Sequence, residues 1–248
     1  MNPLFSIITV TYNAADSIEA TLESISKQTF GNFELLIIDG NSTDNTVELA
    51  EKANIDNIKI FSEKDKGIYD AMNKGLQKSL GKYVLFLNAG DSFHDENILK
   101  NIADKIYENN FPDIVYGQTL IVDHKRKVLG KRHLNAPLHL DFNSFSYGMV
   151  VCHQAFFAKK EITDNYNLKY RFSSDYEWCL KCLMRSQSNI YAGDEPIIDY
   201  LYEGVTTNNH KKSLVERFKI MSEYYGIYKT ICRHISFIPR FVQKKKLK

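Results

Sequence analysis

The sequence has few cysteines and no long apolar run, and each shortage excludes a class of protein. Four cysteines among 248 residues are too sparse for a disulfide framework and fit a reducing compartment. No stretch approaches the roughly 18 consecutive apolar residues of a membrane-spanning helix. The first residues lack the basic and apolar segments of a signal peptide, so we expect none. We therefore expect a cytoplasmic protein of ordinary globular composition.

An excess of basic charge is also lacking outside the end of the chain. The formal net charge is +2, but residues 226–248 hold seven Lys and Arg and no acid, which leaves 25 basic against 30 acidic residues before them. This balance argues against a nucleic-acid-binding surface on the main body. In the tail at 226–248, apolar residues recur beside the basic ones at near-helical spacing, as in helices that lie on anionic membranes. A solvated tail is the open alternative. The apolar residues are Ile227, Ile231, Ile235, Ile238 and Val242, and Pro239 is expected to kink or divide the helix.

Cys179 and Cys182 form a Cys-x-x-Cys pattern, which occurs in zinc sites. Cys152 and His153 are the only nearby candidates to complete such a site. Because the two cysteines lie in an amphipathic helical segment, we expect them to be buried packing residues instead.

Apolar strands and amphipathic helices alternate through the first half. Runs 5–12, 33–39, 58–61 and 83–87 are rich in β-branched and aromatic residues, and helical spacing follows each run. Strands that are apolar throughout are typical of a sheet covered on both faces, and β-α alternation is typical of parallel pairing. We therefore predict an α/β fold with a doubly wound, mostly parallel sheet. The helices are expected near Ile18, from Ser42 or Thr43 to Ala53, from Ile68 to Leu80, and around Ile98, Ile102 and Ile106.

The second half has a less regular pattern, and we expect it to form one wall of a ligand cleft. Its predicted elements are a hairpin at 114–122 and 127–132, helices at 174–185 and 211–225, and a strand pair near Ile190 and at 197–202.

Polar residues lie at or just past the carboxyl ends of the predicted strands. In doubly wound sheets, ligands bind beyond these ends, near the point where the strand order reverses. We therefore expect the polar residues to converge in space. They are Thr11, Asn13, Asp39, Asn88 and Asp91.

This set suits cleavage of a sugar–diphosphate bond, which requires a nucleotide pocket, a cation for the leaving diphosphate and a base for the acceptor. Asp39 is a candidate to accept from a pyrimidine N–H or a ribose hydroxyl, with Thr11 and Tyr12 beside the base; alternatively it opens a turn with Gly40. Asp91 is a candidate ligand for a hard divalent cation; alternatively it belongs to a capping loop.

Residues 63–75 are dense in polar groups where a helix begins. Asp70 and Asn73 are about one helical turn apart, so both can face a ligand. A capped, solvated surface helix is the alternative.

Asp175 lies near the start of the predicted helix at 174–185. From the pattern alone, it is an acid that stabilises the first turn rather than a catalytic group. His153 precedes Gln154 between apolar runs, where a single histidine is usually structural.

Four segments occur in the order and spacing of the inverting glycosyltransferase family 2. They are SIITVTYN, IIDGNSTDNT, SEKDKGIYDAMNKG and GKYVLFLNAGDSF; the match covers roughly residues 4–100, and HQAFF and SSDYEWCL extend it loosely to about residue 185. The sequence therefore resembles this family. The resemblance implies a glycosyltransferase-A fold and transfer of a sugar from a nucleotide-sugar, expected to be a UDP-sugar, to an acceptor hydroxyl with inversion. It also suggests bacterial surface polysaccharide biosynthesis.

The resemblance assigns roles that the pattern left open. Asp175 aligns with the catalytic base of the family, although Ser174 stands where a second acid is often found. The NAGD segment stands where the family has its Asp-x-Asp metal motif. Because Asn88 replaces the first acid, Asp91 is the implied ligand of Mn²⁺ or Mg²⁺.

The implied donor contacts are spread over three segments. Met72 stands where many relatives have an arginine, so phosphate contacts are expected from Lys66 or Lys74. The other implied contacts to the nucleotide-sugar are Thr11, Tyr12, Asn13, Asp39, Asp70, Asn73, Asn88, Ala89 and Gly90, with His153 and Gln154 on the acceptor side.

We expect one glycosyltransferase domain at 1–225, with a nucleotide-sugar half at 1–110 and an acceptor half at 111–225, followed by the tail. Its expected partners are the donor, a saccharide or lipid-linked saccharide acceptor, and a membrane surface for the tail. A nucleotidyltransferase would use a similar sheet and metal, but its usual glycine-rich, basic phosphate loop is missing here. A non-catalytic nucleotide-sugar binding module is a further alternative, because the NAGD segment departs from the metal motif.

Overall fold

The computed structural model describes residues 2–202 and 210–246, and its first half is the predicted parallel sheet. The strands β1 (Phe5–Thr11), β2 (Phe33–Asp39), β3 (Ile58–Ser62) and β4 (Tyr83–Phe86) all run parallel, in the order β3-β2-β1-β4. Every residue of β1 and β2 is buried. This burial explains why these strands are apolar throughout rather than alternating.

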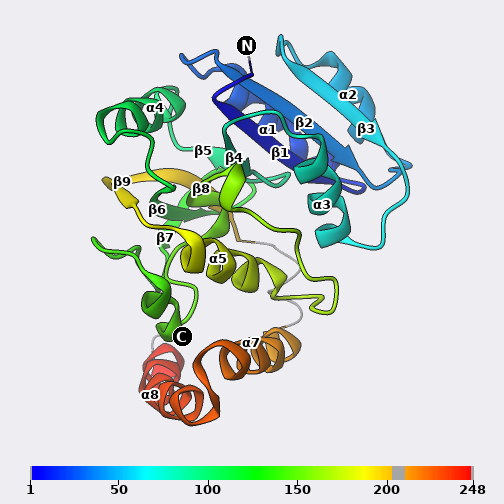
Figure 1. Ribbon diagram of the computed structural model, residues 1–248. Helices are drawn as coiled ribbons and strands as arrows, with labels where there is room; N and C mark the ends of the chain where they lie inside the picture. Colours follow the sequence, from blue (N-terminus) through cyan, green and yellow to red (C-terminus); the bar gives the residue numbers. More distant parts are fainter. Residues whose placement is uncertain (1, 203–209, 247–248) are drawn as a thin grey trace.

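Helices cover both faces of this sheet, as Figure 1 shows. The helices α1 (Ala15–Ser26), α2 (Thr46–Lys52) and α4 (Ile98–Glu108) pack on one face through residues such as Ile18, Ala50 and Ile102. On the opposite face lie α3 (Ile68–Lys78) and α5 (Ser174–Arg185). The predicted doubly wound arrangement is confirmed, and the predicted element ends differ by a few residues only.

Helix α3 lies unusually close to the sheet at Gly75. A Cβ atom on Gly75 would stand 2.4 Å from Cγ2 of Ile8 in β1. Only glycine therefore allows this close approach of α3 to β1.

The second half extends the sheet with a mixture of directions. Strand β8 (Phe156–Lys159) is antiparallel to both β4 and β6 (Ile114–Val122), whereas β9 (Asn189–Leu201) is parallel to β6. Two short strands are added here: β5 (Ser92–Phe93) pairs with β9, and β7 (Val128–Lys131) pairs with β6 in the predicted hairpin. The full order is β3-β2-β1-β4-β8-β6-β9-β5.

The predicted pair of strands near Ile190 and at 197–202 is wrong, because both belong to β9. Tyr191 pairs with Tyr116 and Pro196 pairs with Gln118, so the residues between Tyr191 and Pro196 bulge out of the ladder. Gly193 in this bulge has φ +131°, a conformation that interrupts the strand pattern in the sequence. Because the bulge interrupts the apolar pattern, the single strand β9 resembles two strands in the sequence.

Three 3₁₀ helices and two α-helices complete the described part of the chain. The 3₁₀ helices are η1 (Phe142–Tyr147), η2 (His153–Ala155) and η3 (Lys160–Ile162), and the α-helices are α7 (His210–Tyr225) and α8 (Ile227–Lys246). Helix α8 continues through Pro239, so of the two expected effects the division is wrong and the kink stays a prediction. In the described part of the chain, no helix has the length and apolar character to cross a bilayer.

The cysteine prediction is confirmed by packing. Cys179 and Cys182 are fully buried in the face of α5 that joins the core. Burial also raises the pKa of the Cys179 thiol well above its usual range, so it stays protonated.

Candidate active site

A cleft of about 960 Å³ opens at the carboxyl ends of β1 and β4. The start of α3, the turn η2, the segment 163–173 and the first turn of α5 surround it. The predicted convergence of strand ends is therefore found. The predicted site residues that line the cleft are Thr11, Tyr12, Asn13, Lys66, Asp70, Asn88, Ala89, Asp91, His153, Gln154 and Asp175.

Asp39 lies behind the cleft rather than in it. Its fully buried carboxylate accepts hydrogen bonds from Thr11 Oγ1 (3.0 Å), Ser62 Oγ (2.7 Å), and both the backbone N (2.9 Å) and the hydroxyl (2.5 Å) of Ser42. Burial raises the pKa of Asp39, but these hydrogen bonds outweigh it and hold the pKa below its usual range. The structure thus favours the alternative in which Asp39 organises a turn.

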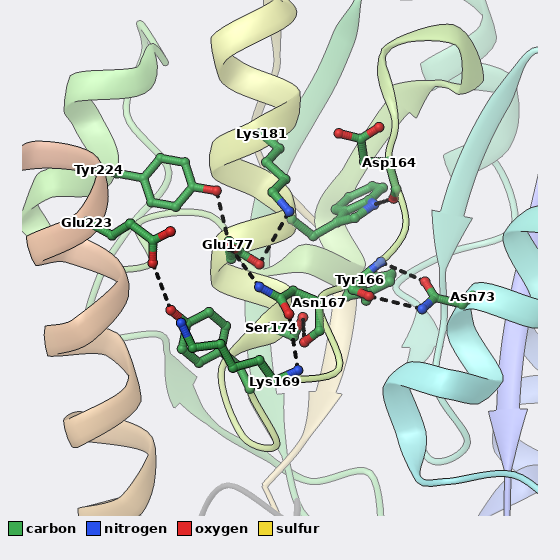
Figure 2. Close-up of polar contacts among 12 residues, drawn as sticks. Asn73, Asp164, Tyr166, Asn167, Lys169, Ser174, Glu177, Lys181, Glu223 and Tyr224 are labelled. Carbon is green, nitrogen blue, oxygen red and sulfur yellow. Dashed lines mark hydrogen bonds and ion pairs between the residues drawn. The ribbon is translucent and has the colours of Figure 1, made fainter.

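Asn73 also lies outside the cleft, one turn deeper in α3 than Asp70. Its side-chain amide exchanges two hydrogen bonds with the backbone of Tyr166, at 3.0 and 2.6 Å, so it fastens α3 to the segment 163–173 (Figure 2). Asp70 reaches the cleft and accepts from the backbone N of Lys66 (3.0 Å). The Lys74 ammonium donates to the Lys64 carbonyl (2.7 Å), and Lys74 does not line the cleft.

The loop after β4 presents two oxygen-bearing side chains. Asp91 is 4% exposed, and its carboxylate accepts from Leu201 N (2.9 Å) and Gln154 Nε2 (2.8 Å). Burial raises the pKa of Asp91 to about 7. The side-chain oxygen of Asn88 is buried and has no hydrogen-bond partner among the described residues. Gly90 does not line the cleft. Its φ of +97° favours glycine, and a Cβ there would stand 2.7 Å from Cδ2 of Leu201.

Whether this loop can hold a divalent cation depends on the side chains of Asn88 and Asp91. The described residues contain no cluster of three His, Cys, Asp or Glu side chains that would enclose a metal. Mg²⁺ is usually held by one or two carboxylates, with waters and substrate phosphates as its other ligands. A carboxylate beside an unpartnered amide oxygen fits that requirement.

Asp175 lies in the cleft between three elements. Its Oδ1 accepts from the hydroxyl of Tyr69 in α3 (3.1 Å) and from the backbone N of Tyr176 (2.9 Å), and its Oδ2 lies 3.7 Å from Nδ1 of His153 in η2. Burial raises the pKa of Tyr69 well above its usual range, so its hydroxyl remains a donor. Burial also lowers the pKa of His153, which favours the neutral ring. Asp175 is therefore oriented by fixed donors, with part of its surface open.

Comparisons with known proteins decide the family. Residues 6–167 match the family model described as glycosyl transferase family 2. The chain belongs to glycosyltransferase family 2. A PGL/p-HBAD biosynthesis glycosyltransferase of Mycobacterium tuberculosis is 34% identical over 186 residues, covering 73% of this chain and 70% of the relative. The teichuronic acid glycosyltransferase TuaG of Bacillus subtilis, whose function is described as putative, is 35% identical over 103 residues, 40% of this chain and 41% of TuaG.

Solved structures confirm the expected glycosyltransferase-A fold of this family 2 enzyme. TarS 1–349 of S. aureus, in complex with UDP-GlcNAc, aligns with a TM-score of 0.73 at 20% identity, over 96% of this chain and 73% of TarS. The family assignment therefore favours a glycosyltransferase over the two alternatives, a nucleotidyltransferase and a non-catalytic binding module.

Several residues of the glycosyltransferase cleft carry no signal in the sequence pattern. Arg132 follows β7, Arg171 lies in the segment 163–173, and Arg217 lies on α7, yet all three line the cleft. Tyr69, which donates to Asp175, was also missed. No motif links these positions, because they are far apart in the chain and meet only through the fold.

Proposed function

We propose that this glycosyltransferase transfers a sugar from a UDP-sugar to an acceptor hydroxyl with inversion, using Asp175 as the base. The observation that carries the proposal is that Asp91 and Asp175 open into one cleft at the strand ends. The solved TarS complexes with UDP and UDP-GlcNAc support the choice of nucleotide.

The donor half of the cleft offers an exposed aromatic ring and a cation. Tyr12 is 66% exposed at the end of β1, so its ring is free to stack on uracil. Lys66 lines the cleft just before the first turn of α3, where unpaired backbone N–H groups also favour phosphate oxygens. We propose that uracil binds at Tyr12 and the diphosphate extends toward Lys66 and Asp91.

We propose that a divalent cation, Mn²⁺ or Mg²⁺, is held by Asp91 with Asn88. When bound, such a cation offsets the charge of the departing diphosphate. Gln154 orients the Asp91 carboxylate through its 2.8 Å hydrogen bond. Oriented ligands of this kind raise metal affinity.

Asp175 performs the proton transfer in this proposal. Its Oδ1 is held by Tyr69 and by the backbone N of Tyr176, which leaves lone pairs of Oδ2 for the acceptor hydroxyl. As the acceptor oxygen forms a bond to the anomeric carbon, its proton moves to Asp175 and the bond to the nucleoside diphosphate breaks on the opposite side. UDP and the glycosylated acceptor are the products.

The proposal is tested by incubating the full chain with a panel of nucleotide-sugars and Mn²⁺, and by measuring the nucleoside diphosphate released. Release of UDP from one UDP-sugar is the expected result, and Asp175→Asn should abolish most of it. Release of pyrophosphate, or binding without turnover, would contradict transferase activity. The PGL/p-HBAD and teichuronic acid relatives support a role in cell-surface glycan synthesis, so surface-glycan acceptors come first in the screen.

We further propose that α8 lies on anionic membrane. Its exposed apolar residues Tyr228 (85%), Ile231 (42%) and Ile235 (61%) recur at helical spacing in a segment that contains no acid. Two of its cations are engaged with the protein, since Arg233 stacks over Tyr147 at 3.8 Å and Lys229 donates to Asn143 at 2.9 Å.

The remaining cations of the tail therefore have to supply the attraction to lipid. They are Arg240, Lys244, Lys245, Lys246 and Lys248, whose side chains lie outside the described residues, as do those of Ile238 and Val242.

Flotation with vesicles of anionic or neutral lipid tests this contact. The full chain should float with the anionic vesicles only, and the double variant Ile231→Asp, Ile235→Asp should not float. Equal flotation of the full chain and a chain ending at Tyr225 would remove the proposal.

A further inference from the structure

Of the three arginines that line the cleft, Arg132 donates to the Met149 carbonyl (3.2 Å), and the other two have no assigned role. Arg171 comes from the segment 163–173, which precedes α5, and Arg217 comes from α7. Their side chains are separate from the carboxylates and amides assigned to the donor. What they bind depends on how firmly they are placed and on which side of the reacting carbon they lie.

The segment that carries Arg171 is held by three helices, as Figure 2 shows for part of it. Asn73 of α3 holds the backbone of Tyr166, and Glu177 of α5 accepts from both Asn167 Nδ2 (3.3 Å) and the hydroxyl of Tyr224 in α7 (3.1 Å). The segment is therefore ordered before any substrate binds, and its side chains require little further ordering.

Glu216 brings the two arginines together. Its carboxylate accepts from the backbone N of Arg171 (2.9 Å) and of Phe172 (2.8 Å), so the first part of α7 is fastened directly to the residue that carries one guanidinium. Arg217, the next residue of α7, carries the other. Both groups thus reach the cleft from one connected framework.

The Nε of the Arg217 guanidinium is buried and has no hydrogen-bond acceptor among the described residues, whereas the residue as a whole is half-buried. Its guanidinium carbon lies over the Tyr176 ring, 5.9 Å from the ring centroid. A buried, unsatisfied donor on a charged group is costly, and a planar guanidinium is well matched to the paired oxygens of a phosphate.

The position of Arg217 relative to Asp175 indicates which substrate supplies the phosphate. The Arg217 guanidinium carbon lies 5.9 Å from the centroid of the Tyr176 ring, and Tyr176 is the residue that follows the base. Arg217 and Asp175 line the same cleft, so Arg217 enters it on the side of the first turn of α5. In an inverting displacement, the base and the departing diphosphate lie on opposite sides of the anomeric carbon, so a cation beside the base faces the acceptor.

We propose that Arg171 and Arg217 form a subsite for a phosphate group carried by the acceptor. The acceptor is then a phosphate- or diphosphate-bearing saccharide rather than a neutral sugar. This inference rests on the proposed function, because it uses Asp175 as the base and a UDP-sugar as the donor.

The test measures binding of geranyl diphosphate to protein that is already saturated with UDP, so that the donor diphosphate position is filled. Binding is measured by calorimetry at fixed Mg²⁺, with geraniol as the neutral probe. The variants are Arg217→Gln and Arg171→Gln. The control is Lys219→Gln, which removes an exposed cation of α7 that does not line the cleft.

Geranyl diphosphate should bind the UDP-saturated protein, and geraniol should not. Arg217→Gln should weaken this binding by roughly ten-fold or more, as expected for one lost charge-assisted contact, and Arg171→Gln should weaken it as well. Lys219→Gln should leave it within about two-fold. The affinity for UDP itself should stay constant in all three variants.

Three outcomes would overturn the subsite. Geranyl diphosphate that does not bind UDP-saturated protein, or that binds all variants equally, removes it. A loss of UDP affinity in Arg217→Gln would assign the guanidinium to the donor diphosphate instead. Failure of the unmodified chain to bind UDP at all would be a failure of the proposed function, and the UDP titration detects it separately.

Discussion

The donor wall of the cleft follows from strand ends, whereas the acceptor wall is held by hydrogen bonds between irregular segments. We define the donor wall by Tyr12 and the loop Asn88–Asp91, and the acceptor wall by η2, the segment 163–173 and α7. The donor wall is placed by parallel pairing, since β1 lies between β2 and β4: Thr11 lies opposite Asp39 of β2, and the loop that follows β4 lies on the other side of β1. The acceptor wall depends on individual side chains such as Glu216 and Asn73. One wall is positioned by backbone pairing, and the other by specific contacts.

The largest effect is expected on the acceptor wall, at Asp175. Asp175→Asn keeps an oxygen to accept from Tyr69 and Tyr176 but cannot take the acceptor proton at neutral pH. We expect kcat to fall by roughly 100- to 10,000-fold, with donor Kd and Tm almost unchanged. Steady-state kinetics, UDP titration and thermal unfolding of this variant measure the three quantities.

Glu177 on the same helix provides the matched control. It is 2% exposed, does not line the cleft and is engaged by Asn167 and Tyr224. Glu177→Gln should therefore lower stability more than kcat. A near-normal kcat in Asp175→Asn together with a large loss in Glu177→Gln would move the base to Glu177.

The next effect tests the donor wall through its proposed cation. Asp91→Asn should lower kcat by about 100-fold, the scale of one lost electrostatic contact to a developing charge. Asn88→Asp adds a carboxylate and should lower the Mn²⁺ concentration required for half-maximal turnover. Both are read from turnover during Mn²⁺ titration, and undiminished turnover in excess EDTA would show that no cation is required.

Asp39 tests whether a residue behind the donor wall contributes to stability or to direct binding of the nucleotide. Asp39→Asn disturbs a buried carboxylate with four hydrogen bonds, so we expect a loss of about 2 kcal/mol in the free energy of unfolding. The folded variant should bind UDP within about two-fold of the unmodified protein. Urea unfolding and UDP titration measure these quantities. Unchanged stability with lost UDP affinity would instead make Asp39 a direct nucleotide contact.

The smallest effect is expected at Tyr12, which contacts solvent rather than core. Tyr12→Ala should weaken UDP binding by roughly five- to ten-fold, the usual contribution of ring stacking, without changing Tm. Tyr12→Phe keeps the ring and should bind UDP normally. Equal UDP affinity in the alanine variant would place the uracil elsewhere.

The same division explains what could be predicted from the sequence. The sheet and the donor-wall residues Asn88 and Asp91 follow from apolar periodicity and from polar residues at strand ends. Asp175 was assigned only through family resemblance, because its position in a first helical turn is equally typical of a structural acid. Arg217 had no signal, since its place in the cleft depends on how α7 packs against a segment about forty residues earlier in the chain.

Periodicity also misled at Asn73. Its helical spacing from Asp70 was read correctly, but spacing describes only the direction around the helix. The position along the helix axis decides which residues the side chain contacts. Asn73 therefore hydrogen-bonds to the backbone of Tyr166 and does not reach the cleft.

The three-residue turn η2 lies between the two carboxylates to which we assign roles, Asp91 and Asp175. Gln154 holds the Asp91 carboxylate, and His153, its neighbour in the chain, faces Asp175. Neighbouring Cα atoms are separated by about 3.8 Å whatever the substrate does. Consecutive residues of η2 therefore contact Asp91 and Asp175, so the proposed metal ligand and the proposed base are both tied to one short stretch of backbone.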